Sequence, residues 1–354
     1  MCGAMRWWKH IIAAMVACLC LTSLPTSASE VHDEAEVDVA ELVFGHIGDA
    51  YGWHLTTWKG DHVTIPLPCI VHSSTGWHVF MSSKLEHGEI YEGLYLSQEN
   101  KIMEILPDGS VERPFDISIT KNVASLMISA LLLIVIVLGT ARWYRKHDTM
   151  KEGSPKGFAG LVEMLVEMVT DDLVKPSIDE RYYRKYTPFL LTVFFFIFLS
   201  NLLGIVPFFP GGANVTGNIA VTMVLALFTF FMVNLFADKH YWKEILWPDA
   251  PIFLKFPLPI MQIIEIFGML SKPFSLMVRL FANILAGHAM ILGLVAVIFV
   301  TAKMGPVLSG SMTFITVIFG VFMDCLELLV AFIQAYVFTM LSAVFIGMSR
   351  QGGH

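Results

Sequence analysis

The sequence has few charged residues for its length. Only 15% of its 354 residues are Asp, Glu, Lys or Arg, whereas 55% are hydrophobic, and the mean hydropathy is +0.65. A water-soluble domain of this size carries more charge, so we expect most of the chain to lie in a membrane. The net charge of -7 and the lack of clustered Lys and Arg exclude a nucleic-acid partner. The sequence contains no Gly-rich phosphate-binding loop, so we expect no nucleotide site.

Cysteines are also few, and they provide no disulfide framework. Three of the five lie within the first 20 residues, and the other two, Cys69 and Cys325, fall in segments of opposite character. Seven histidines between His32 and His87 lack the spacing with Cys or Asp that is typical of metal sites. We therefore favour ordinary surface histidines over metal ligands, and we expect no metal and no cofactor.

The N-terminus has the three-part layout of a secretory signal. Arg6 and Lys9 precede the apolar run Ile11–Leu24, and small residues follow at Thr26-Ser27-Ala28. The run is shorter than the roughly 20 residues that span a bilayer, which favours a signal peptide (1–28) over a retained anchor.

Residues 29–120 follow this signal and are predicted to form an exported, periplasmic, acidic domain. Between Glu30 and Asp116 there are 16 Asp or Glu residues, against only three Lys and one Arg. Short apolar runs broken by Gly, Pro and Asp108-Gly109 predict short strands and turns.

Residues 121–354 are predicted to form an all-α polytopic membrane domain with about five transmembrane helices. Arg142, Arg145 and Lys146 follow the first span and place its end on the cytoplasmic side by the positive-inside rule, so that the C-terminus is also cytoplasmic. Between the first two spans, residues 157–174 have the pattern of an amphipathic interfacial helix. The predicted spans are 123–141, 187–206, 218–236, 258–300 and 307–348.

The last two apolar segments are unusually long. At 1.5 Å per residue each is roughly 60 Å, about twice the thickness of the hydrocarbon core. Either they are broken, as Pro273 would allow in the first, or both are steeply tilted. A tilted helical hairpin could follow the curved surface of another protein. The sequence also lacks the inverted repeat that is typical of many secondary transporters.

A lone arginine, Arg279, lies within the first long segment, where a charge costs on the order of 3 kcal/mol. Ser275 and Asn283 are four residues to either side and share its helical face, while His288 is nine residues further on. A voltage sensor is disfavoured because it needs repeated arginines.

The last segment carries Glu327 and Gln334, seven residues apart on one helical face. If the two segments form an antiparallel pair, Gln334 lies near the depth of Arg279, and Glu327 lies near that of His288. The alternative is that Arg279 snorkels to an interface while His288 and Glu327 only satisfy each other.

Several motifs together carry a family resemblance. They are Pro273-Phe274-Ser275-Leu276-Met277-Val278-Arg279-Leu280-Phe281-Ala282-Asn283, Ala286-Gly287-His288, Gln334-Ala335-Tyr336-Val337-Phe338, Asn201-Leu202-Leu203-Gly204-Ile205-Val206-Pro207 and Asn214-Val215-Thr216. From about Ile119 to its C-terminus the chain resembles subunit a of F-type ATP synthases. The acidic N-terminal segment exceeds the family's usual minimum.

The resemblance implies that Arg279 faces a ring of c subunits and separates two proton half-channels. It implies that His288 and Glu327 line the half-channel open to the outside, with Asn201, Asn214 and Gln334 as supporting polar groups. It assigns Ser275, Asn283 and Glu265 to the cytoplasmic half-channel.

The implied protein is a non-catalytic, multi-pass inner-membrane subunit. Its implied partners are the c ring, b-type peripheral-stalk subunits, the catalytic head through the complex, and membrane lipid. Two alternatives stay open at this stage. An independent transporter or channel would have its substrate site at Arg279, and a structural scaffold would not need Arg279 for energy coupling.

Overall fold

A computed structural model of the chain describes residues 48–58, 61–97, 100–147, 155, 157–206, 209–247, 260–302 and 305–350. The predicted signal peptide lies outside these residues. The described residues fall into two compact units, the first within 287–327 and the second within 48–286 and 328–350. In the first unit, the described part is a helical hairpin. The second unit contains all of the described strands and the other helices.

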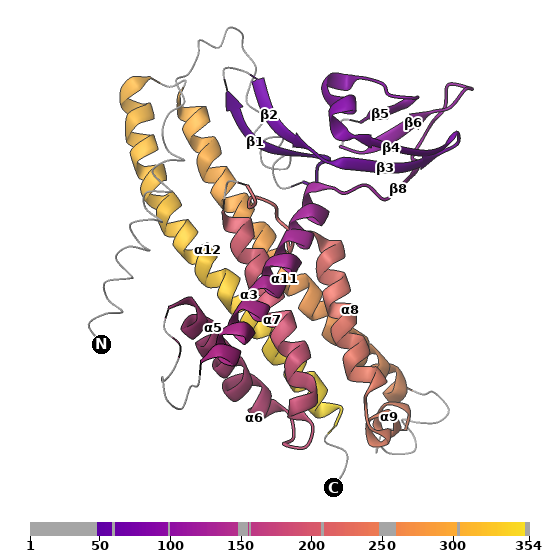
Figure 1. Cartoon of the computed structure of the whole chain (residues 1–354), viewed down its shortest axis with the longest axis vertical. Helices are drawn as coiled ribbons and strands as arrows, with labels where there is room; N and C mark the ends of the chain where they lie inside the picture. Colours follow the sequence, from indigo (N-terminus) through magenta and orange to yellow (C-terminus); the bar gives the residue numbers. More distant parts are fainter. Residues whose placement is uncertain are drawn as a thin grey trace. The chain divides into compact units, whose positions relative to one another are not determined.

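Residues 48–120, here called the strand region, contain three small antiparallel sheets (Figure 1). The first sheet pairs β1 (Gly52–Trp58) with β2 (Asp61–Pro66). The second sheet places β3 (Pro68–Ser73) between β4 (Gly76–Met81) and β8 (Phe115–Asp116). The third sheet places β6 (Ile102–Ile105) between β5 (Leu94–Leu96) and β7 (Val111–Glu112), and the 3-10 helix η1 (Ser82–Gly88) follows β4. The prediction of short strands is confirmed.

Alternation along β3 and β4 gives the strand region its own small core. Cys69 and Val71 are fully buried and pack with Phe80, Leu94 and Ile102. Burial is the main cause that raises the pKa of the Cys69 thiol to about 11. This thiol is therefore a neutral core group at physiological pH.

Long apolar helices make up most of the remainder. They are α3 (Lys121–Lys146), α7 (Tyr183–Ile205), α8 (Ile219–Leu235), α11 (Ile260–Ala302) and α12 (Pro306–Met348), with the short α9 (Lys239–Leu246) after α8. Among the described residues, four helices are long and apolar enough to span a membrane, or five if α8 and α9, which meet at a 102° bend, form one span. The prediction of a helical membrane protein with about five spans is confirmed.

Local sequence signals explain where several helices begin. The Thr120 side chain caps α3 by accepting a hydrogen bond from the backbone N–H of Val123, and Asn218 caps α8 by accepting one from Ala220. Arg145 and Lys146 occupy the last turn of α3, where positive charge is favourable to the helix dipole.

The segment predicted as an amphipathic helix is helical. It consists of α5 (Phe158–Glu167), the π-helix η2 (Met168–Val174) and the single turn α6 (Lys175–Ser177). Val162, Leu165 and Val169 are buried, whereas Glu163 and Glu167 are partly exposed or exposed. Its apolar face packs into the main hydrophobic core of the second unit, which also receives side chains from α7, α8, α9, α11 and α12.

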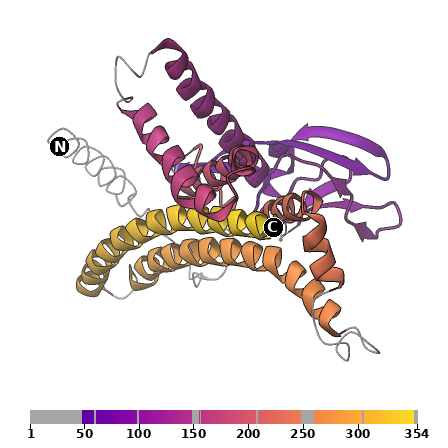
Figure 2. The ribbon, with the colours of Figure 1, turned by 90° about the horizontal axis from the view of Figure 1, so that it is seen from below.

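Both of the last two helices are 43 residues long and uninterrupted. They run side by side in Figures 1 and 2. Pro273 lies inside α11 without breaking it, so a break at that position is not the explanation for its length. Proline leaves the carbonyl four residues earlier without its usual donor, a defect that membrane helices tolerate when neighbouring helices cover it.

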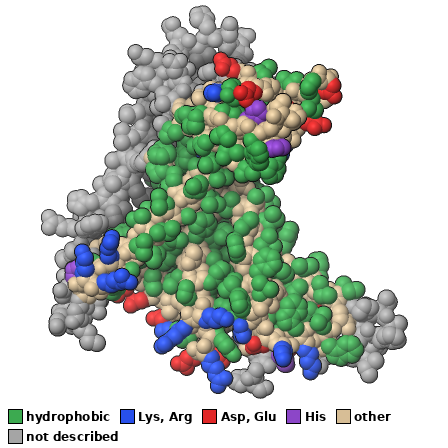
Figure 3. Space-filling model, turned by 45° about the vertical axis from the view of Figure 1, so that its right-hand side comes forward, with side chains coloured by type: hydrophobic (Ala, Val, Ile, Leu, Met, Phe, Trp, Pro, Cys, Tyr) green, Lys and Arg blue, Asp and Glu red, His purple; other side chains and the backbone are tan. Residues whose placement is uncertain are grey.

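Charged side chains are distributed unevenly over the second unit. In Figure 3, Lys and Arg gather at the end that carries α6, α9 and the last turn of α3. The visible charged side chains of the strand region are mostly acidic, and hydrophobic side chains cover the surface between the two ends. Helix α3 contributes exposed Met127, Leu131 and Leu138 to this apolar surface, as a lipid-facing helix does.

Candidate functional site

Arg279 lies on an exposed polar stripe of α11. Ser275, Arg279 and Asn283 follow one another at four-residue spacing, and all three are exposed. An adjoining face, about 100° further around the helix, carries Leu276, Leu280 and Ile284, which are buried in the core. The core contacts therefore fix the rotation of α11 and turn the stripe outward.

Arg279 has no partner within the described part of the chain. Its guanidinium forms no ion pair and no hydrogen bond there. In contrast, Arg350, just beyond α12, donates hydrogen bonds to Asp238 (2.9 Å) and to the Tyr186 hydroxyl (2.9 and 3.1 Å). Arg350 therefore has its hydrogen-bond partners within the chain, whereas Arg279 is exposed on the protein surface.

His288 and Glu327 meet in the helical hairpin of the first unit. His288 Nδ1 and Glu327 Oε1 form a short hydrogen bond between α11 and α12. Glu327 is only 6% exposed, so its carboxyl group depends on this partner. Gly287 lies against the same carboxylate, because a Cβ at that position would be 3.4 Å from Oε1. The structure therefore brings together the pair that the offsets of nine and seven residues predicted.

Asp324, which is not among the predicted site residues, lies three residues before Glu327 on α12. It is half-buried and contributes a second carboxylate to the same helical face, about 4.5 Å along the axis. The i, i+3 spacing of two acids in an apolar segment was the signal that could have identified it.

Gln334 and Arg279 are not joined. Gln334 is buried in α12 and makes no hydrogen bond to any described residue. The predicted similarity in depth therefore remains a prediction, without a direct contact between the two side chains.

Asn201, on α7, links the α7–α8 loop (residues 209–218) to α12. Its Oδ1 accepts a hydrogen bond from the Thr216 hydroxyl at 2.5 Å, and its Nδ2 donates to the Ala331 carbonyl at 3.3 Å. All three groups are buried. Thr216 was not selected from the sequence, although it ends the Asn214-Val215-Thr216 motif.

Asn214 is held within the same loop. Its Oδ1 accepts the backbone N–H of Gly217 at 2.9 Å, and its buried Nδ2 has no hydrogen-bond partner among the described residues. A Cβ at Gly217 would lie 2.0 Å from Nδ2, so only glycine fits there without moving the amide. Asn201 and Asn214 thus each hold part of the α7–α8 loop, and their predicted supporting role in a half-channel stays a prediction.

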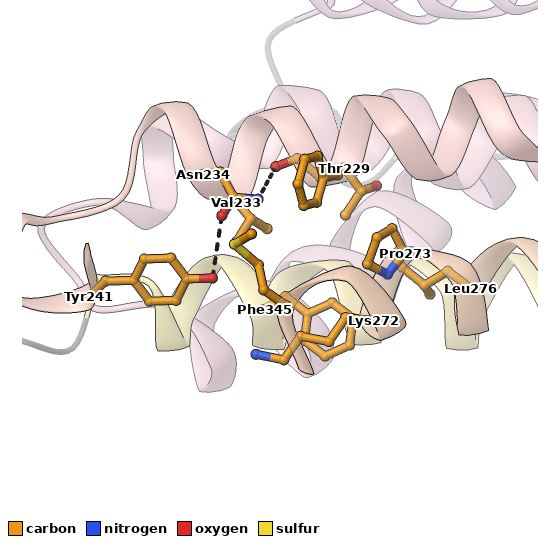
Figure 4. Close-up of a pocket in the computed structure, with 10 residues that line it drawn as sticks. Thr229, Val233, Asn234, Tyr241, Lys272, Pro273, Leu276 and Phe345 are labelled. Carbon is orange, nitrogen blue, oxygen red and sulfur yellow. Dashed lines mark hydrogen bonds between the residues drawn. The ribbon is translucent and has the colours of Figure 1, made fainter. Parts of the chain in front are cut away.

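A small, partly open cavity lies among α8, α9, α11 and α12 in the second unit (Figure 4). Tyr241 donates a hydrogen bond to Asn234 Oδ1 at 3.4 Å, and Asn234 Nδ2 donates to the Phe230 carbonyl at 2.8 Å. Lys272, Pro273 and Leu276 line the α11 side, with Lys272 Nζ 5.5 Å from the centroid of the Phe345 ring.

The residues predicted for the cytoplasmic half-channel do not line this cavity. Ser275 and Asn283 face outward, and Glu265 is partly exposed near the start of α11. Glu265 is nevertheless close enough to Tyr241 to act on it electrostatically. Asn234, Tyr241 and Lys272 are polar groups at this site that the sequence analysis did not select.

Both the membrane helices and the strand region match known family models. Residues 125–347 match the family model described as ATP synthase A chain, and residues 42–122 match a domain of unknown function (DUF8433). ATP synthase subunit a 2 of Chlorobaculum tepidum is 40% identical over 348 residues, which cover 96% of this chain and 92% of that protein.

Two further relatives agree. ATP synthase subunit a of Chlorobium phaeobacteroides is 38% identical and aligns with 93% of this chain and 89% of its own length. The subunit a of Myxococcus xanthus is also 38% identical, over 82% of this chain and 90% of its own. The chain belongs to the family of subunit a of the F-type ATP synthase.

Proposed function

We propose that this chain is the proton-conducting stator subunit of a rotary ATP synthase, in which Arg279 separates two half-channels that open to opposite sides of the membrane. Membership of the subunit a family makes the chain a non-catalytic, proton-translocating component of the membrane sector. The proposal concerns how its residues divide this work.

The observation that carries the proposal is the exposed, unpartnered Arg279 in an apolar helix. A guanidinium in contact with hydrocarbon costs on the order of 3 kcal/mol even on insertion scales, so it needs a compensating anion. The described residues supply none, and the stripe of Ser275, Arg279 and Asn283 faces away from the core. A carboxylate on a neighbouring subunit satisfies this requirement, which supports a c-subunit ring as the partner.

The permanent positive charge of Arg279 is suited to block direct proton transfer between the two half-channels. Because the guanidinium does not lose its proton in a protein, it attracts an ionised carboxylate and favours release of that carboxylate's proton. The same charge repels a proton that would otherwise cross directly between the half-channels. Ring rotation then becomes the route by which a proton passes from one side to the other.

His288 and Glu327 would form the relay of the half-channel open to the outside. Imidazole and carboxyl groups can each accept and release a proton, and their short hydrogen bond provides the path between the two helices. Asn201, Asn214 and Gln334 are assigned supporting roles as buried polar groups.

Ser275, Asn283 and Glu265 are assigned to the cytoplasmic half-channel. Ser275 and Asn283 flank Arg279 on the exposed face, and Glu265 lies near the beginning of α11. Asn234, Tyr241 and Lys272, which line the small cavity in Figure 4, are further polar groups in the second unit.

The proposed orientation places the C-terminus in the cytoplasm and the strand region in the periplasm of an inner membrane. The concentration of Lys and Arg at the α6 and α9 end supports it by the positive-inside rule. Domain boundaries at residues 28 and 120 follow from the same topology. The peripheral-stalk subunits, the catalytic head and lipid complete the proposed set of partners.

An independent transporter with its substrate site at Arg279 is less well supported. Such a site would be enclosed by the chain, whereas Arg279 is exposed and does not line the described cavity. Transport by the purified chain alone would favour that alternative.

The test is ATP-driven proton pumping in inverted membrane vesicles that contain the assembled enzyme. We expect Arg279→Ala to abolish pumping with unchanged assembly, whereas Arg142→Ala, an exposed arginine at the end of α3, leaves pumping intact. Coupled pumping by the Arg279→Ala enzyme would overturn the proposal and return us to the transporter or scaffold interpretation.

A further inference from the structure

Trp53 on β1 is the most deeply buried tryptophan that the structure describes, although it belongs to the small strand region. It is 3% exposed and packs with Ala213 and Val215 of the α7–α8 loop, which are 0% and 1% exposed. Its indole also meets the Phe209 ring edge-on, with centroids 5.2 Å apart. The partly buried residues around this cluster are Ile65, Ala124, Leu126, Ile128 and Val221.

The other side of the same loop carries the Asn201 and Asn214 cluster. Val215, under the indole, is followed by Thr216, whose hydroxyl bonds to Asn201. At Gly211 a Cβ would be 2.3 Å from the Val206 carbonyl oxygen, so the loop is pressed against the end of α7. A loop held on both faces transmits a displacement at Trp53 to the Thr216–Asn201 hydrogen bond.

The strand region is in turn fixed to a membrane helix. The Asp49 carboxylate accepts hydrogen bonds from the Thr120 hydroxyl at 2.8 Å and from the backbone N–H of Asn122 at 3.1 Å, at the first turn of α3. The Lys121 N–H donates to the Ala50 carbonyl at 2.8 Å. Trp53, three residues after Ala50, is therefore held at a defined position relative to α3.

We infer that Trp53 is a positioning residue for the half-channel open to the outside, and that the strand region acts as a brace that holds the α7–α8 loop in place through it. The inference rests on the proposed function, because it assigns Asn201, Asn214 and Thr216 to that half-channel. It gives residues 42–122, whose family-model match is a domain of unknown function, a role in proton access.

The experiment compares Trp53→Ala, Trp53→Phe and Trp77→Ala in the assembled enzyme in membrane vesicles. Trp77 is the matched control, because it is a tryptophan of the same region that is 59% exposed and lies on β4, away from the Trp53 cluster. Two quantities are measured per assembled complex. One is the maximum rate of ATP synthesis, and the other is the external proton concentration that gives half of that rate.

We expect Trp53→Ala to raise the half-saturating external proton concentration several-fold with a smaller change in maximum rate. Trp53→Phe should restore most of the native value, and Trp77→Ala should behave as native. A second readout is the labelling of Ala213→Cys by a membrane-impermeant maleimide, in a chain whose Cys69 and Cys325 are replaced by alanine. Trp53→Ala should expose this cysteine and speed its labelling several-fold.

Native proton affinity and native protection of position 213 in Trp53→Ala would overturn the inference, as would equal defects in Trp53→Ala and Trp77→Ala. If Trp53→Ala assembles poorly, the same two readouts on Trp53→Phe and Trp53→Leu decide the question, since the brace predicts a larger defect for leucine. Arg279→Ala is assayed in parallel. If Arg279→Ala loses pumping while Trp53→Ala keeps native values in both readouts, the proposed brace is rejected and the proposed function is retained.

Discussion

Two ionisable side chains of α11, Arg279 and His288, differ in whether they have a partner within the described chain. His288 has a carboxylate partner within the chain, whereas Arg279 has none among the described residues. A buried pair stabilises both of its groups only while both are present, and an exposed cation in hydrocarbon must be neutralised from outside. Under the proposed function, this difference separates a relay group, His288, from a group that acts on another subunit, Arg279.

Exchange of the relay pair tests whether its chemistry or its order matters. His288→Ala removes one of the two proposed relay groups and leaves the buried Glu327 carboxyl without its hydrogen-bond partner, so we expect proton pumping to fall on the order of a hundredfold. The double variant His288→Glu with Glu327→His restores one acid and one imidazole on facing helices and should recover a large part of the rate. Equal loss in the single and double variants would contradict a relay.

Asp324 provides a second test on the same helix. It precedes Glu327 by about one turn, so a proton from the proposed outer side reaches it first. We expect Asp324→Asn to lower the rate of gradient-driven ATP synthesis several-fold, while Cys325→Ser, at the neighbouring exposed position, has no effect. A native rate in Asp324→Asn would exclude it from the path.

The C-terminal end of α12 is held in place by the hydrogen bonds of Arg350. Arg350 joins the end of this helix to Tyr186 on α7 and to Asp238 between α8 and α9. Tyr186 is fully buried, so this is a structural ion pair at the rim of the core rather than a surface contact. It anchors the helix that carries Glu327 and Gln334.

Loss of that anchor should destabilise the chain without changing its chemistry. We expect Arg350→Ala to lower the free energy of unfolding by about 1–3 kcal/mol, because hydrogen bonds to a charged group are lost and the Tyr186 hydroxyl stays buried. The measurement is thermal unfolding of the purified complex in detergent, with exposed Lys243→Ala as control. An unchanged transition would mean that packing alone holds the end of α12.

Element by element, hydropathy predicted most of the membrane fold. The five predicted spans correspond to α3, α7, α8, α11 and α12, because long apolar runs between charged loops have few other solutions. The continuity of α11 through Pro273 could not be predicted, since neighbouring helices decide whether a proline breaks a membrane helix.

At the site, the sequence predicted what lies along one helix better than what lies between elements. The His288–Glu327 pair followed from matched offsets on two antiparallel helices. The hydrogen bond from Asn201 to the Ala331 carbonyl and the contact of Trp53 with the α7–α8 loop join segments more than 100 residues apart, and no local periodicity indicates such contacts.

For the molecule as a whole, we propose that the single charge of Arg279 prevents protons from passing directly between two half-channels. The most direct measurement is passive proton flow through vesicles from which the catalytic head has been removed, with the ring immobilised by a disulfide between Ala282→Cys, on the exposed face of α11, and a cysteine in the c subunit. With rotation blocked, the native chain should conduct no protons, and Arg279→Ala should leak. If the Arg279→Ala enzyme conducts no more protons than the native one under the same cross-link, Arg279 is not the barrier between the half-channels.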